Sequence, residues 1–168
     1  MRQAWRYWRE RPAPHDLAEA QHVLGAALWP LFLRQSRAEQ AHALRVWRRV
    51  QALGGDVLVQ QAALLHDVGK SRVDLHLVER ALAVLGRRLF PARARGAWAQ
   101  GAPRGWRRAF VVAEQHATWG AEWARAAGAP PAVVALIQHH HAPRPAFADP
   151  AQVRRWALLR QADEEGDA

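Results

Sequence analysis

Leu64-Leu65-His66-Asp67-Val68-Gly69-Lys70 is the stretch around which the sequence is organised. A histidine and an aspartate stand side by side at the end of an apolar run, and a glycine and the only lysine of the protein follow. Imidazole nitrogens and carboxylate oxygens are both metal ligands. The same pattern is also typical of a polar helix end, with the glycine just after the cap. The choice between a helix end and a metal site depends on the other histidines and aspartates.

The segment before this stretch is predicted to form two helices. Apolar spacing indicates the first over residues 15–34, with a break or kink at Pro30. Ser36 and Glu39 form a capping box, so the second helix should begin there and run to about Leu53.

The helix that carries the central stretch is predicted to be buried. Asp56 can cap it, and residues 57–67 are apolar nearly all round the helix. His66 and Asp67 would then end the most buried helix of the protein. A buried carboxylate needs a partner, which a metal ion or a basic side chain can supply.

The second half of the chain is predicted to form further helices, over about residues 73–90, 110–128, 131–141 and 151–162. In the first of these, the spacing indicates an inward-facing apolar stripe made of Leu75, Val78, Leu82, Leu85 and Leu89. No segment resembles a strand of consequence. The sequence therefore predicts an all-α fold, a compact single-domain bundle of about six to eight helices.

Length and composition set limits on the class of protein. A chain of 168 residues fits one domain, here residues 15–168 after an N-terminal arm of residues 1–14. There is no cysteine, which excludes disulfides, thiolate metal sites and a thiol nucleophile. The arm has no apolar core typical of a secretory signal, and no run is long enough to span a membrane. We therefore expect a cytoplasmic protein.

The formal net charge of +9 comes almost entirely from arginine and favours anionic partners: phosphorylated metabolites, nucleic acid or anionic lipid. Residues 80–113 contain arginines and no acidic residue. They form either a solvated basic face or a phosphate-attracting lid, for which Arg104 and Arg107 are the candidate phosphate-binding residues. The Trp- and Arg-rich arm either packs on the domain or touches a membrane surface or nucleic acid. No dedicated nucleic-acid motif is present.

Histidines and aspartates at or near the buried faces of five predicted helices complete the pattern. They are His42, His66, Asp67, His116, His140, His141 and Asp163. Six or seven nitrogen and oxygen ligands exceed the needs of one tetrahedral ion and suit two ions bridged by a carboxylate. Iron, manganese, zinc and cobalt all fit such ligands. His140 and His141 share the helix face of Ile137 and are the favoured pair, although the pair His139 and His140 stays open.

The order and spacing of these residues resemble the HD-domain superfamily of metal-dependent phosphohydrolases, over most of the chain. The stretch from His66 to Lys70 resembles the HD-x-G-K box of the HDIG-type subgroup. Three later segments are similar to the H-x-x-x-G, I-x-x-H-H and A-D elements of the family: residues 116–120, 137–141 and 162–163.

The resemblance implies an HD-type helical domain that hydrolyses phosphate esters, often nucleotides, through a metal-activated water. It implies that His42, His66, Asp67 and Asp163 form the basic metal site, and that the three later histidines complete a second one, with Asp67 as the bridge. Lys70 would bind a phosphate oxygen or stabilise charge in the transition state. Asp67 and Lys70 are thus the candidate catalytic residues, and a small phosphorylated or nucleotide substrate is the expected partner.

The sequence also departs from the family pattern. Ala117 stands where a proline often follows the histidine. The residues after His141 are Ala-Pro-Arg-Pro, which differ from the run found in cyclic di-GMP phosphodiesterases, so that activity is not expected. One alternative is a non-catalytic HD-like regulatory or ligand-binding module, which should have lost ligands. Another is an Arg-rich nucleic-acid binder, which leaves the histidines and aspartates unexplained.

Overall fold

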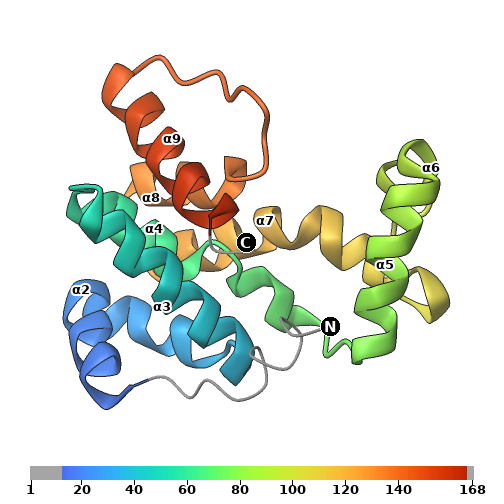
Figure 1. Cartoon of the computed structure of the whole chain (residues 1–168), viewed down its shortest axis with the longest axis horizontal. Coiled ribbons are helices and arrows are strands. Elements are labelled where there is room, and N and C mark those ends of the chain that lie inside the picture. The colour runs from blue at the N-terminus through green and yellow to red at the C-terminus, as the bar shows by residue number, and fades with distance from the viewer. Residues whose placement is uncertain (1–12, 166–168) are drawn as a thin grey trace.

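The structure is a computed structural model of the chain and describes residues 13–165. These residues form eight α-helices and two short 3-10 helices (Figure 1). They are α2 (Pro14–Leu33), α3 (Arg37–Ala52), α4 (Val57–Leu65), η1 (Val68–Arg72), α5 (Leu77–Leu89), α6 (Pro91–Arg95), η2 (Gly105–Arg107), α7 (Arg108–Ala126), α8 (Pro131–His139) and α9 (Pro150–Glu164). Residues 13–165 contain no strand, which confirms the all-α prediction. Most of the N-terminal arm predicted over residues 1–14 lies outside the described residues.

The predicted helix starts are present in the structure. The backbone nitrogen of Glu39 donates to the Ser36 hydroxyl at 3.3 Å, and the Ser36 nitrogen donates to the Glu39 carboxylate at 2.9 Å, which completes the capping box of α3. Asp56 caps α4 by accepting a hydrogen bond from the Val59 nitrogen at 3.1 Å. Both caps are local interactions, which is why residue types alone predict them.

The break in α2 lies at Gly25, and the prediction of a break at Pro30 was wrong. Gly25 has a φ of 67° and a ψ of 177°, which separates two helical segments. Glycine has no Cβ and reaches this backbone region at little cost. Pro30 lies within the second segment.

Helix α4 is central to the core, as predicted. Its residues Val59, Ala62, Ala63, Leu64 and Leu65 are all fully buried. Side chains from α2, α3, α8, α9 and the C-terminal half of α7 pack in the same cluster. The chain therefore enters the stretch from His66 to Lys70 directly from the middle of the core.

Helix α5 differs from the prediction in its start and in its orientation. Residues 73–76, between η1 and α5, are not helical, so α5 begins at Leu77 and not near Val73. Four members of the predicted inward stripe face solvent, and Val78 is 79% exposed. They are Val78, Leu82, Leu85 and Leu89. Only Leu75, which precedes the helix, is partly buried and packs on a small cluster with Phe110. Periodicity correctly identified one apolar face, but it does not say whether that face meets the core.

Helices α5 and α6, with the residues that follow them through η2, form a projection beside the bundle. In Figure 1 they lie at the right, and α7 runs from the bundle toward them. Ala83, Ala94 and Phe110 are buried between the projection and the start of α7. Residues 91–106, which lie between the helices predicted over residues 73–90 and 110–128, contain α6 and the beginning of η2. None of the described helices is long and apolar enough to span a membrane.

Candidate metal centre

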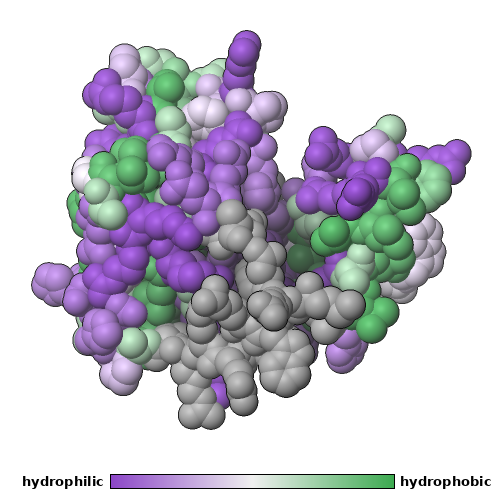
Figure 2. Space-filling view, in the orientation of Figure 1, coloured by the Kyte–Doolittle hydropathy of each residue, from purple (hydrophilic) through white to green (hydrophobic). Residues whose placement is uncertain are grey.

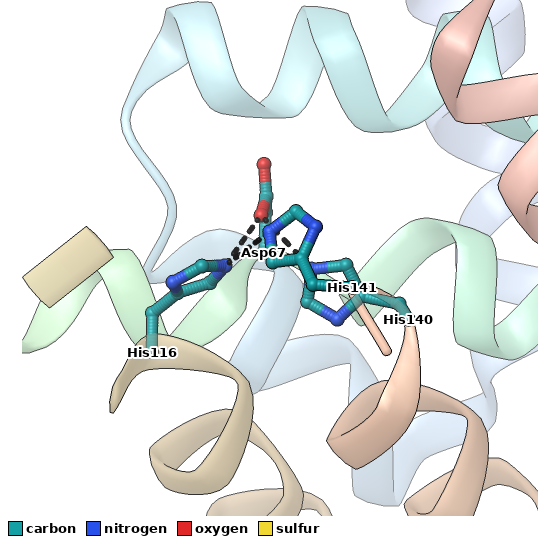
Figure 3. A group of neighbouring side chains, drawn as sticks. All are labelled: Asp67, His116, His140 and His141. Carbon is teal, nitrogen blue, oxygen red and sulfur yellow. Dashed lines mark hydrogen bonds and ion pairs between the residues drawn. The ribbon is translucent and has the colours of Figure 1, made fainter. Parts of the chain in front are cut away.

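The structure brings all seven predicted ligand residues together in two neighbouring groups. One group is made of Asp67, His116, His140 and His141, and the other of His42, His66 and Asp163. Within each group, one nitrogen or oxygen atom of each residue lies within 4.8 Å of the corresponding atoms of the others. Figure 3 shows the three imidazoles of the first group around the Asp67 carboxylate. These residues come from α3, α7 and α9 and from the chain directly after α4 and after α8, so the site depends on the whole bundle.

Asp67 belongs to the first group and also faces the second. Its Oδ1 atom is 3.3 Å from Nε2 of His116 and 3.8 Å from Nε2 of His140. Its Oδ2 atom is 3.5 Å from Nε2 of His66 and 3.9 Å from Nε2 of His42. Each carboxylate oxygen therefore faces a different group, which is the arrangement that a bridging ligand requires.

Asp163 closes the second group from the end of α9. Its Oδ1 atom is 3.0 Å from Nε2 of His42 and 3.4 Å from Nε2 of His66. His42 is buried on α3, 121 positions earlier in the sequence. The packing of α9 against α3 and α4 thus unites residues that no local pattern connects.

Three histidines of the site are held by backbone carbonyls on the side away from Asp67. Their Nδ1 atoms form these contacts: His66 with Ala63 (2.9 Å), His116 with Val112 (3.0 Å) and His140 with Ile137 (2.7 Å). A carbonyl oxygen can only accept, so in each neutral ring Nδ1 carries the proton. The lone pair is then on Nε2, the atom that faces the cluster. Outer contacts of this kind fix the tautomer and the ring orientation of metal-binding histidines.

Several buried polar atoms at the centre lack a hydrogen-bond partner within residues 13–165. They are Nε2 of His66, Nε2 of His140 and Oδ1 of Asp67. Such atoms cost free energy unless something else satisfies them. A divalent cation would accept the lone pairs of all three. Nitrogen and oxygen donors without sulfur fit a divalent transition metal.

Both carboxylates of the site are ionised. Burial by itself would raise the pKa of Asp67, but the charges of Lys70 and His66 and the contact with His116 hold it well below its usual range. Burial would also raise the pKa of Asp163, and its contacts with His42 and His66 lower it instead. Two buried carboxylates that stay negative favour a cation between them.

The histidines differ in their affinity for a proton. Burial would lower the pKa of His66, but the charge of Asp67 and the contact with Asp163 raise it to about 9. Burial, together with the nearby charge of His66, lowers the pKa of His140 well below its usual value. Desolvation and the neighbouring His116 lower the pKa of His141 to about 4. Without a metal, His66 therefore carries a proton at neutral pH while His140 and His141 are neutral.

Lys70 lies at the edge of the centre. Its Nζ atom donates to Oδ2 of Asp67 at 2.5 Å, and its side chain is partly exposed. Burial would lower its pKa, but the negative charges of Asp67, Glu39 and Asp163 raise it. The ammonium group is therefore cationic beside the proposed ligands.

Gly69 makes a close backbone approach between η1 and α7. A Cβ atom at Gly69 would stand 1.9 Å from the carbonyl oxygen of His116 and 2.7 Å from the nitrogen of Gly120. Gly69 does not have a positive φ, so it is not the left-handed residue of a helix C-terminus. Its role is to provide space, which lets Asp67 and Lys70 lie directly against the α7 histidine.

The run of three histidines spans the end of α8. His140 is buried, and Nε2 of the exposed His141 lies 3.2 Å from Nε2 of His116. The His139 ring packs on Phe147 instead and belongs to neither group. The structure thus gathers His140 and His141, the pair that the sequence favoured.

Arg104 and Arg107 are not brought to the cluster. The Arg107 guanidinium donates to the carbonyls of Ala97, Trp98 (3.3 Å) and Gln100 (2.9 Å), and so closes the preceding loop. Arg104 is exposed, one residue before η2. Arg107 and His116 are nine positions apart, which corresponds to roughly 13 Å along a helix. A phosphate-binding role for these two arginines therefore stays a prediction.

Glu39 lies near the site and has a second role besides capping α3, which the sequence did not reveal. The capping box accounts for its Oε2 atom, but the carboxylate is buried and its Oε1 atom accepts from Arg80 at 2.9 Å. Its charge contributes to the raised pKa of Lys70. Nothing in the sequence distinguishes this glutamate from an ordinary exposed capping residue.

Comparison with protein families matches residues 40–165 to the HD domain model. This range contains every residue of both groups. Comparisons with curated proteins and with solved structures found no significant match. Because the matched range spans most of the sequence and the fold is all-helical, the chain belongs to the HD domain family.

Proposed function

We propose that this protein is a metal-dependent phosphohydrolase or phosphodiesterase of the HDIG type, acting on a nucleotide or another small phosphate ester. HD domains bind divalent metals, and the family consists in general of hydrolases. The observation that carries the proposal is the position of Asp67, whose two carboxylate oxygens each face a separate group of ligand atoms. Assignment to the HDIG type rests on the stretch from His66 to Lys70.

We assign the proposed ligands to two metal ions, one for each of the two groups of residues. His42, His66, Asp67 and Asp163 would hold one ion, and Asp67 would share the other with the later histidines of the cluster. Those later histidines are His116, His140 and His141. Iron, manganese, zinc and cobalt are all compatible with this donor set. When bound, two such cations would polarise the phosphate and lower the pKa of a water molecule.

The chain's own residues prepare this chemistry. The backbone carbonyls behind His66, His116 and His140 hold each Nδ1 and direct each Nε2 at the cluster, so metal binding requires no change of tautomer and only the loss of the Nε2 proton of His66. Asp67 remains ionised between the groups because Lys70 and the neighbouring imidazoles oppose its protonation. The site is therefore preorganised for cations.

Lys70 is proposed to bind the substrate phosphate. Its ammonium group has three donors, of which one is directed to Asp67. Because the side chain is partly exposed, the remaining donors can meet a phosphate oxygen that arrives from solvent. His141 is the exposed member of its group, which supports a substrate entrance beside it.

Metal analysis combined with a nucleotide panel tests this function. The purified protein, supplied with Mn²⁺, should hydrolyse at least one phosphate ester, and Asp67→Ala should lose both activity and metal. His140→Ala should also lose activity, whereas His139→Ala is the matched control because His139 is the neighbouring histidine outside both groups. If the wild-type protein binds no transition metal, or if His140→Ala and His139→Ala behave alike, the proposal fails.

A further inference from the structure

The outward face of α5 is apolar. Val78, Leu82, Leu85 and Leu89 follow one another at helical spacing, and all four are exposed within the described structure. We name these four residues the outer stripe. In an ordinary surface helix such a stripe faces the core, and exposed polar residues occupy the other side. Here the arrangement is reversed.

The inward face of α5 is fixed by small and charged residues. Gly86 packs on the ring of Phe110, where a Cβ atom would approach to 2.5 Å. Arg87 pairs with Glu114 at 2.9 Å, and Glu79 pairs with Arg108 at 3.0 Å. Turning the outer stripe toward α7 would break both ion pairs and remove this close packing. The stripe is therefore a stable feature of the surface.

Aromatic and basic side chains accompany the outer stripe. Phe90 and Trp106 are exposed on the same projection. Exposed arginines that form no ion pair within residues 13–165 are also found there: Arg88, Arg93, Arg95 and Arg104. No acidic residue occurs between positions 80 and 113. Figure 2 shows hydrophobic residues over the projection at the right, with hydrophilic residues along its upper edge.

We propose that the projection of α5, α6 and η2 binds the surface of an anionic lipid bilayer. The outer stripe and the exposed aromatic rings would enter the boundary between headgroups and acyl chains, where Trp, Phe and Leu are favoured. The unpaired arginines would contact lipid phosphates, which they complement in charge. A basic amphipathic helix with a large apolar face is typical of binding in the plane of the membrane surface. The proposal does not depend on the hydrolase activity.

Other occupants fit these residues less well. A second copy of the projection would bring two arginine-rich segments together, and the one acidic residue of α5, Glu79, is already paired with Arg108 of its own chain. Nucleic acid would neutralise the arginines but would leave the aliphatic side chains of the outer stripe in water. An anionic bilayer satisfies the charge and the apolar face at once.

Vesicle co-sedimentation of the full chain tests this proposal with a matched pair of double variants. Leu82→Glu with Leu85→Glu disrupts the outer stripe at side chains that are 41% and 54% exposed. Val153→Glu with Val57→Glu is the control, because it makes the same change in charge at side chains that are 41% and 53% exposed elsewhere on the surface. Circular dichroism and thermal melting would verify that both variants fold.

The wild-type protein should sediment with vesicles of phosphatidylcholine and phosphatidylglycerol and much less with phosphatidylcholine alone, and salt should weaken the binding. The outer-stripe variant should bind at least about tenfold more weakly, and the control should bind like the wild type. Equal binding by the two variants would overturn the proposal, because the arginines or residues 1–12 would then account for it. Absence of vesicle binding would also overturn it, whether or not the protein self-associates or binds nucleic acid instead.

Discussion

Gly69 and His116 touch backbone to backbone: a Cβ atom at Gly69 would stand 1.9 Å from the His116 carbonyl oxygen. This contact joins η1, which follows Asp67 and carries Lys70, to the helix that carries His116. The absence of a side chain at Gly69 therefore allows the Asp67 carboxylate to lie against His116.

Gly69→Ala should separate these two elements. We expect the protein to lose about 1–3 kcal/mol of stability and much of its metal-dependent activity, because the backbone of η1 must move away from α7. Gly54→Ala is the control: its φ of 75° disfavours alanine, but a Cβ atom there meets nothing within 4 Å. Thermal melting and metal analysis of both variants make the comparison. Unchanged metal content in Gly69→Ala would show that the contact does not position the site.

Lys70→Met should reduce turnover while leaving metal content near that of the wild type. The side chain keeps its approximate length but loses the charge proposed to meet the phosphate, so kcat/KM should fall by about 10²–10³-fold. Kinetics on the best substrate and metal analysis are the two measurements. Loss of metal from this variant would show that Lys70 supports the ligand residues and does not act on the substrate.

Metal binding should release a proton from His66. The pKa of this imidazole in the metal-free protein is about 9, above the ordinary value of 6.5, so the group is protonated at pH 7 and must lose that proton to bind a metal. Metal affinity should therefore rise as the pH increases from 7 to about 9. Calorimetric titration at pH 7 in two buffers with different ionisation enthalpies measures the proton directly. Identical apparent enthalpies in the two buffers would contradict this account of His66.

The stability of the metal-free protein should show the opposite dependence on pH. A raised pKa means that the folded state binds the proton more tightly than the unfolded state. The contribution of His66 to stability is therefore fully present below about pH 6.5 and is lost as the pH rises through about 9. Denaturant unfolding of chelator-treated protein across this range, compared with metal-loaded protein, would reveal the difference. A metal-free protein that gains stability across this range would disagree with the raised pKa.

Arg107→Ala should act on stability and not on substrate affinity. The guanidinium has three carbonyl partners in residues 97–100, and their loss should cost about 1–3 kcal/mol in the projection. Melting curves and KM for the best substrate distinguish this role from phosphate binding. A large rise in KM with an unchanged melting temperature would instead support the phosphate-binding role predicted from the sequence.

Local patterns predicted much of the fold. The capping box of Ser36 and Glu39 and the cap at Asp56 depend on residues three positions apart, so the sequence alone identifies them. The apolar run before His66 likewise predicted a buried helix. The ligand candidates were identifiable because imidazole and carboxylate groups are uncommon on buried helix faces.

Other features depend on packing between distant segments. The need for glycine at position 69 arises only because α7 passes beside η1. The outward direction of Leu82 and Leu85 depends on ion pairs that anchor the other side of α5. Helical periodicity defines a face of a helix, but the rest of the fold decides what that face meets.

Metal stoichiometry tests the bridging role of Asp67 most directly. Elemental analysis of the wild-type protein and of Asp67→Ala, His140→Ala and His139→Ala should be performed after reconstitution with Mn²⁺. We expect about two ions per chain in the wild type and in His139→Ala, about one in His140→Ala, and almost none in Asp67→Ala. Retention of both ions by Asp67→Ala would show that this carboxylate does not join the two halves of one metal centre.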